Sequence, residues 1–174
     1  MDVKLVKKAI KGDERAFEWL VREESDKLYR TAYLYVRNKD DALDIVQEAV
    51  CKAFLSIHQL KEPAYFSTWL TKILIRTAYD FIKKQKKIVL TGDDFLDQIA
   101  PSESVAKEDE MDLAHAIATL DYHYQTVIIL FYYHDQSIQS ISLTMDKPEG
   151  TIKTYLHRGK AELKRILEGV NVYG

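Results

Sequence analysis

Apolar residues recur at steps of three and four over residues 3–36, the spacing that places side chains on one face of an α-helix. Phe17, Leu20 and Leu28 belong to this series. A polar stretch at 38–40 interrupts the pattern, which predicts a break between two helices.

The next periodic segment begins near Asp40 or Asp41, either of which is placed to cap a helix. Four residues form its apolar face: Ala42, Ile45, Ala49 and Ala53. A break at 61–63, which contains Pro63, precedes a further helical pattern over 66–87 that ends in a cluster of lysines.

The periodicity is lost after this cluster. Residues 89–109 include Gly92 and Pro101 and are rich in Asp and Glu, so we expect a flexible acidic linker. A helical pattern resumes from Leu113 to Leu120. The apolar run 127–133 suits a buried helix better than a strand, because helical patterns flank it.

The last part of the chain has the spacing of a helix-turn-helix. One short helix is expected over 137–145, a turn at 146–147, and a second helix from Pro148 to about Glu168. Asp146 suits the turn because its short polar side chain tolerates a left-handed backbone. With only three prolines and six glycines in 174 residues, the predicted fold class is all-α. We expect two small helical domains, residues 1–88 and 110–174, joined by the linker 89–109.

The distribution of charge along the chain bears on whether the protein binds nucleic acid. The total is −2, but residues 1–87 carry a net +5, residues 88–112 carry −7, and residues 113–174 are balanced. Local charge governs contact with phosphates, so the small negative total does not exclude nucleic-acid binding.

The last predicted helix offers chemistry suited to DNA. Ile152, Leu156 and Leu163, together with Gly159, form its inward face. The other side carries hydroxyls, a histidine and cations that can reach phosphates and base edges in a major groove: Thr151, Lys153, Thr154, His157 and Arg158. Taken alone, this pattern more often belongs to a solvated amphipathic helix, because Lys and Arg are ordinary on exposed faces.

Two short stretches resemble a known DNA-reading domain and so favour the DNA-binding interpretation over a solvated helix. GTIKT at 150–154 and LHR at 156–158 resemble the C-terminal promoter-reading domain of extracytoplasmic-function (ECF) sigma factors of bacterial RNA polymerase, and the similarity extends upstream through AIATL at 116–120 and YQTV at 124–127. The resemblance implies that this domain reads the minus-thirty-five promoter element.

The first half resembles the other domain of that family. GDERAF at 12–17 is similar to its opening, and DALDIVQE at 41–48 to its polymerase-docking helix. The acidic side of that helix would by itself suit a solvated surface. The resemblance implies that four residues pair with a basic coiled coil of the largest polymerase subunit: Asp41, Asp44, Gln47 and Glu48.

FSTWLTKI at 66–73 resembles the segment that melts and reads the minus-ten element. Unstacked bases stack on aromatic rings while cations hold the strand. The candidates are Tyr65, Phe66, Lys72, Arg76, Lys83, Lys84, Lys86 and Lys87. We expect Trp69 to be a core residue; Phe66, three residues earlier on the same helix face, suits the core as well.

Some positions depart from the family pattern. Arg76 stands where Asn is usual, Asp121 where Pro is usual, and Ser140 where an acidic residue is usual. Asp146 replaces a common turn glycine. Gly159 replaces a usual alanine, which by helix propensity weakens the recognition helix by about 1 kcal/mol.

Other functional classes lack support in the sequence. The five histidines show no paired ligand spacing and there is no glycine-rich phosphate loop, so we expect no enzyme, no metal and no cofactor. The lone Cys51 and the polar start predict a cytoplasmic protein, and no apolar run suggests membrane insertion. The expected partners are core RNA polymerase, promoter DNA and, by resemblance, an anti-sigma factor. The alternatives are a stand-alone helix-turn-helix regulator with a helical dimerisation or sensing domain, and a helical adaptor.

Overall fold

The computed structural model describes residues 2–91 and 108–170, and every regular element in these ranges is helical. The chain divides into two compact units. Among the described residues, the first comprises 2–33 and 39–91, and the second comprises 34–38 and 108–170. The expectation of an all-α chain with two helical domains is confirmed.

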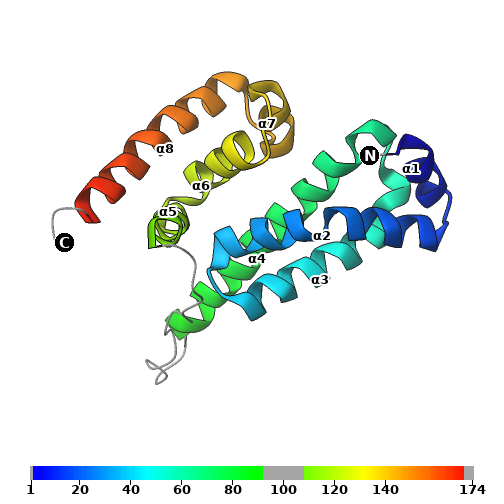
Figure 1. Ribbon diagram of the computed structural model, residues 1–174, viewed down its shortest axis with the longest axis horizontal. Helices are drawn as coiled ribbons and strands as arrows, with labels where there is room; N and C mark the ends of the chain where they lie inside the picture. Colours follow the sequence, from blue (N-terminus) through cyan, green and yellow to red (C-terminus); the bar gives the residue numbers. More distant parts are fainter. Residues whose placement is uncertain (1, 92–107, 171–174) are drawn as a thin grey trace. The chain divides into compact units, whose positions relative to one another are not determined.

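The first unit is built from three long helices, α2 (Glu14–Val36) as far as Tyr33, α3 (Lys39–Ser56) and α4 (Phe66–Thr91), as Figure 1 shows. A short helix, α1 (Val3–Ile10), precedes them. Within this unit, the most extensive packing is between α3 and α4. The core of the first unit is formed by fully buried side chains from α2, α3 and α4: Leu20, Ile45, Phe66, Leu70 and Leu74.

Short polar residues start the first two helices. The Asp2 carboxylate accepts a hydrogen bond from the Lys4 amide at 2.8 Å, and the Asp13 carboxylate accepts one from the Ala16 amide at 3.0 Å. Each cap satisfies a backbone N–H that has no partner within its helix. Gly12, with φ of 96°, makes the turn between the two helices.

Two single 3₁₀ turns, η1 (Ile57–Gln59) and η2 (Pro63–Tyr65), connect α3 to α4 at the predicted break. The predicted break at 38–40 is also found, but α3 begins at Lys39. Asp40 and Asp41 therefore lie in the first helical turn instead of capping it. The helix dipole by itself favours negative side chains there, because they face its positive end.

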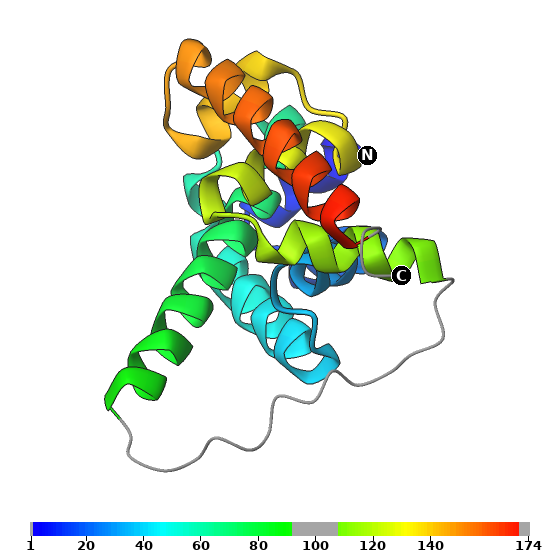
Figure 2. The same cartoon turned by 90° about the vertical axis from the view of Figure 1, so that its left-hand side faces the viewer.

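The second unit contains α5 (Glu108–Thr119), α6 (Tyr122–Ile128), a π-helical turn η3 (Ile129–Tyr133), α7 (Ile138–Met145) and α8 (Glu149–Val170). Within it, α8 packs along α6 and also contacts α5 and α7 (Figure 2). The apolar run at 127–133 is helical and largely buried, as predicted, with Val127 and Leu130 fully enclosed.

The helix bounds reach into the predicted linker from both sides. Helix α4 continues to Thr91 and α5 begins at Glu108, so residues 89–91 and 108–109 are helical. The remaining expected linker, residues 92–107, lies outside the described part of the chain.

Candidate polymerase and nucleic-acid interfaces

The candidate docking helix α3 buries one face and exposes the other. Ala42, Ile45, Ala49 and Ala53 are completely buried, as the periodicity predicts. Asp44, Gln47 and Glu48 are exposed. Glu48 Oε1 lies 2.7 Å from Lys52 Nζ, and Lys52 Nζ also donates to Thr77 Oγ1 of α4 at 3.3 Å. The Glu48 charge is therefore partly balanced within the unit, whereas Asp44 projects to solvent without a described partner.

Asp41 lies in a different environment from the other three docking candidates. It is half-buried, and a hydrogen bond joins its side chain to Gln85 near the end of α4. Burial raises the pKa of Asp41, and the nearby Asp44 and Asp40 carboxylates raise it further, while the bond to Gln85 lowers it. Asp41 thus ties α3 to α4 as well as contributing to the acidic surface.

The same helix exposes apolar residues that the sequence pattern did not single out. Leu55 is 74% exposed, and Leu43 and Phe54 are each close to half exposed. The Phe54 ring contacts Phe17 of α2 edge-on, with 5.3 Å between ring centroids. The signal was available for Leu43 and Phe54, because eleven residues are close to three full turns and place both on one flank of α3.

The three aromatic residues at the start of α4 have different accessibilities. Tyr65, in the turn η2, is 61% exposed. Phe66 is 0% exposed, so its ring cannot stack on a base in this conformation, contrary to its place among the minus-ten candidates. Trp69 is half-buried and packs against Phe66, with 6.0 Å between centroids. Phe66 is the first residue of α4 and is enclosed in the core of the first unit, while Tyr65 still belongs to the preceding turn.

The basic candidates of α4 form a stripe along one face. The stripe consists of residues at steps of four, seven and three along the helix: Lys72, Arg76, Lys83 and Lys86. From its first to its last residue it covers about 21 Å of helix. Lys72 is half-buried, and Arg76, Lys83 and Lys86 are exposed. Lys84 is also exposed, but its position along the helix places it off this face. Lys87 belongs to α4, and its side chain lies outside the described residues.

In the second unit, α7 and α8 form the helix-turn-helix. The turn is made by Asp146, whose φ of 53° is left-handed as expected. Ser142 Oγ donates to the Lys147 carbonyl at 2.6 Å across the turn. Ser137 caps α7 by accepting from the Ser140 amide at 3.1 Å. Helix α8 begins at Glu149, and the Pro148 carbonyl accepts its first hydrogen bonds.

Helix α8 presents its candidate residues outward. Ile152 and Gly159 are buried, and Leu156 and Leu163 are half-buried, which agrees with the predicted inward face. The remaining expected DNA contacts are exposed except Thr151, which is half-buried: Lys153, Thr154, His157 and Arg158. Thr154 Oγ1 donates to the Gly150 carbonyl at 2.9 Å and keeps its oxygen available as an acceptor.

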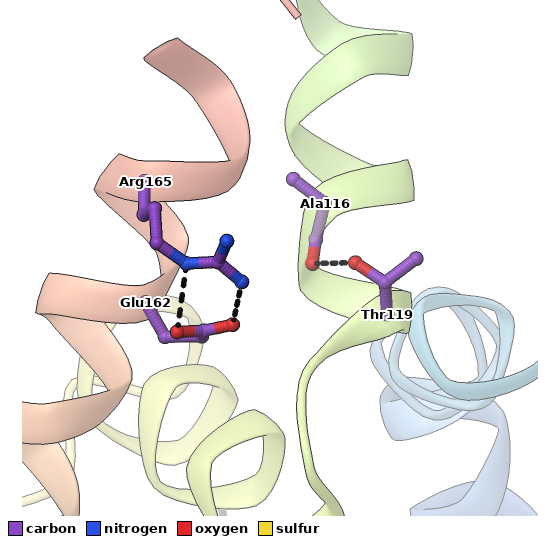
Figure 3. Close-up of polar contacts among 4 residues, drawn as sticks. All are labelled: Ala116, Thr119, Glu162 and Arg165. Atoms are coloured by element: carbon purple, nitrogen blue, oxygen red, sulfur yellow. Dashed lines mark hydrogen bonds and ion pairs between the residues drawn. The ribbon is translucent and has the colours of Figure 1, made fainter. Parts of the chain in front are cut away.

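The cations of α8 differ between its two halves. Towards the C-terminus, Arg165 forms a two-pronged pair with Glu162, at 2.6 and 3.2 Å (Figure 3), and Lys164 Nζ lies 3.5 Å from Glu168. The bond to Arg165 lowers the pKa of Glu162. In the described part of the chain, Lys153 and Arg158 form no ion pair. The cations of α8 without an ion pair in the described part of the chain are therefore Lys153, Arg158 and Lys160, all of which precede Lys164.

Two departures from the family pattern have structural explanations. Asp121 caps α6 by accepting from the His123 amide at 3.0 Å, a role that compensates for the absent proline. A Cβ on Gly159 would lie 3.2 Å from Tyr124 Cβ and 3.3 Å from Ile128 Cγ1. Glycine at 159 thus permits the close approach of α8 to α6.

An aromatic contact at the recognition helix was missed from the sequence. The rings of His123 in α6 and Tyr155 in α8 stack, with centroids 5.3 Å apart and planes at 16°, and Tyr124 meets Tyr155 edge-on at 5.9 Å. These rings hold the first turns of α8 against α6. Only the unusual density of rings at 122–124 hinted at this role.

Two general observations concern the described residues. None of their helices is long and apolar enough to cross a membrane. No group of three or more His, Cys, Asp or Glu side chains among them is arranged to hold a metal ion.

Comparisons with known proteins agree with this division of the chain. Residues 20–88 match the family model "Sigma-70 region 2", and residues 110–163 match "Sigma-70, region 4". The RNA polymerase sigma factor SigV of Bacillus subtilis is 39% identical over 149 residues, covering 84% of this chain and 87% of SigV. The ECF RNA polymerase sigma factor SigW of the same organism is 31% identical over 178 residues, covering 94% and 95%.

Two solved structures share the fold. CnrH, in complex with the cytosolic domain of CnrY, has a TM-score of 0.74 at 20% identity and covers 97% of both chains. The sigma factor RpoE of Bartonella quintana, in complex with the anti-sigma factor NepR, also has a TM-score of 0.74, at 22% identity, covering 87% of this chain and 96% of RpoE. These findings favour the sigma-factor hypothesis over a stand-alone helix-turn-helix regulator. The chain belongs to the ECF group of bacterial RNA polymerase sigma factors.

Proposed function

We propose that this sigma factor divides its work among three helices: α3 docks on core RNA polymerase, α4 with the turn before it opens and reads the minus-ten element, and α8 reads the minus-thirty-five element. The observation that carries the assignment of α8 is the contrast along its length. Lys164 and Arg165, near its C-terminus, are paired within the helix, whereas the earlier Lys153 and Arg158 form no ion pair in the described part of the chain.

The assignment of α8 rests on geometry as well as charge. A major groove about 12 Å wide admits one α-helix, and the first turns of a recognition helix approach the base edges. Lys153, Thr154, His157 and Arg158 lie in those turns on the side away from Ile152. Arg158 suits a base edge or its neighbouring phosphate, and Lys153 suits a phosphate.

For the minus-ten element, the exposed ring of Tyr65 is the candidate for stacking on an unpaired base, a contact worth about 1–3 kcal/mol. The basic stripe of α4 leads away from this position and suits the backbone of the separated strand. Phe66 supports the site from the core instead of contacting DNA.

For docking, Asp44, Gln47 and Glu48 form the exposed polar surface of α3. A basic coiled coil of the largest polymerase subunit would complement it, as the resemblance implies. Asp41 positions this surface through its bond to Gln85.

We further propose that an anti-sigma factor controls the chain and that it serves as an alternative factor induced by stress at the cell envelope. The support is that CnrH and RpoE, which share its fold, are in complex with CnrY and with the anti-sigma factor NepR.

Transcription from a promoter library randomised in the upstream element tests the assignment of α8. Holoenzymes carrying Arg158→Ala or Lys153→Ala are compared with the parent, and Lys164→Ala provides a matched control because Lys164 is paired with Glu168. Loss of a base contact costs roughly 1–3 kcal/mol and relaxes preference at one position, whereas loss of a phosphate contact weakens all sequences. If both variants behave like Lys164→Ala, α8 does not read DNA.

Binding to core polymerase tests the docking helix separately. Asp44→Lys should weaken core binding, while Glu23→Lys, an exposed acid of α2, makes the same charge change elsewhere on the unit. Exposed charges contribute little to stability, so both variants should fold. Equal core affinity in the two variants would exclude α3 as the docking surface.

A further inference from the structure

The short helix α1 carries a basic face that none of the assignments above uses. Its lysines, at positions 4, 7, 8 and 11, follow the i, i+3, i+4, i+7 spacing that places side chains on one side of a helix. All four are exposed, including Lys11, which is the C-cap residue. The opposite side of α1 is buried through Val6 and Ala9.

No ion pair balances this face within the described residues. Like charges at these spacings repel one another, which disfavours the helix. The two nearest acidic side chains in sequence are otherwise engaged, because the carboxylates of Asp2 and Asp13 cap α1 and α2. Some exposed cations elsewhere in the unit do have partners, as Arg22 does with Glu18 at 3.0 Å. An unbalanced basic face of this kind suits a polyanion.

The position of α1 indicates which polyanion. Helix α1 packs against η1 and η2, the two turns that lead into α4, and lies at the end of the first unit where α4 begins (Figure 1). The exposed ring of Tyr65 belongs to η2. Lys61, between the two turns, is also exposed. The basic face and the candidate stacking residue are thus carried by elements that touch each other.

We propose that the lysine face of α1 binds the sugar-phosphate backbone of promoter DNA next to the minus-ten element. The inference rests on the proposed role of Tyr65 and α4 in opening that element. Lysine acts as a point charge with a flexible stem, so these contacts hold the DNA without reading its sequence. The α1 face therefore adds affinity, and the specificity stays with α4 and α8.

The test uses holoenzyme reconstituted with Lys7→Gln/Lys8→Gln sigma factor and with the variant in which all four lysines are replaced by glutamine. Arg22→Gln/Arg30→Gln, on α2, is the control for the double variant because it removes the same charge from exposed positions of the same unit. The probe is a fluorescein-labelled promoter fragment selected from a random library by the parental holoenzyme. Its affinity is measured over a series of KCl concentrations, and core affinity is measured separately.

Each lost phosphate contact should reduce the slope of log affinity against log salt by roughly 0.7–0.9. We expect the double variant to lose up to two such contacts, the quadruple variant more, and the control none. The effect should be equal for all promoter sequences, with core affinity unchanged. Circular dichroism and tryptophan fluorescence verify that each variant is folded.

Two results would overturn the inference. Unchanged salt slopes, in a parental holoenzyme that does bind the promoter, would show that α1 does not contact DNA. A loss of core affinity with an unchanged slope would assign the lysines to an acidic surface of polymerase. Failure of the parental holoenzyme to select any promoter would instead refute the proposed function as a whole.

Discussion

Replacing Gly159 by alanine separates two opposing effects in the recognition helix. Helix propensity alone favours alanine by about 1 kcal/mol in a helix interior. The structure opposes it, because the added Cβ would lie 3.2 Å from Tyr124 Cβ, 3.3 Å from Ile128 Cγ1 and 3.4 Å from the Tyr124 carbonyl oxygen. Two of these atoms belong to or adjoin the backbone of α6, so relief requires α8 to move away from α6.

The net magnitude follows from these two contributions. Overpacking of a close contact costs about 1–3 kcal/mol. Subtracting the gain in propensity leaves a loss of about 1 kcal/mol in the unfolding free energy of the second unit. Gly169→Ala is the control, since a Cβ there meets nothing within 4 Å. It should be neutral or slightly stabilising, because Gly169 lies near the end of α8.

The assay must report on the second unit alone. Both tryptophans, Trp19 and Trp69, lie in the first unit, so their fluorescence serves as an internal reference. Native-state hydrogen exchange of the α6 and α8 amides gives the opening free energy of the second unit. If the amides are more strongly protected from exchange in Gly159→Ala than in the parent, the close contact between α8 and α6 does not outweigh helix propensity, and the reasoning is wrong.

Three further predictions concern the turn, the acidic helix and the exposed ring. Asp146→Gly should stabilise the second unit by about 0.5 kcal/mol in the same exchange assay, because glycine adopts the left-handed backbone without strain but gains entropy when unfolded. Burial raises the pKa of Asp41, so its ionised form opposes folding and the stability that it contributes is lost as pH rises through its titration. Asp41→Asn should therefore remove this fall in stability with rising pH from the profile measured by tryptophan fluorescence in urea, and an unchanged profile would contradict this. Tyr65→Ala should reduce permanganate reactivity of promoter thymines in the holoenzyme complex roughly tenfold, while Tyr65→Phe retains it, because stacking needs the ring and not the hydroxyl.

Much of this protein could be predicted from its sequence because local patterns determine helices. The steps of three and four residues located the helices, the polar stretch at 38–40 and Pro63 located breaks, and Asp146 located the left-handed turn. The inward face of α8 was also read correctly, since the period of a helix fixes which residues share a side. Resemblance supplied the family, which the comparisons confirmed.

Tertiary structure alone decided which residues of a candidate set are accessible. Tyr65 and Phe66 are neighbours with similar rings, yet one is exposed and the other completely buried, because the chain passes from a 3₁₀ turn into a packed helix between them. The bond between Asp41 and Gln85 joins residues far apart in the sequence. Helix propensity predicts that alanine at 159 would stabilise the second unit, whereas the close contact between Gly159 and α6 predicts that it would destabilise the unit. Each of these depends on distances between helices, and the periodicity of a single helix carries no information about its neighbours.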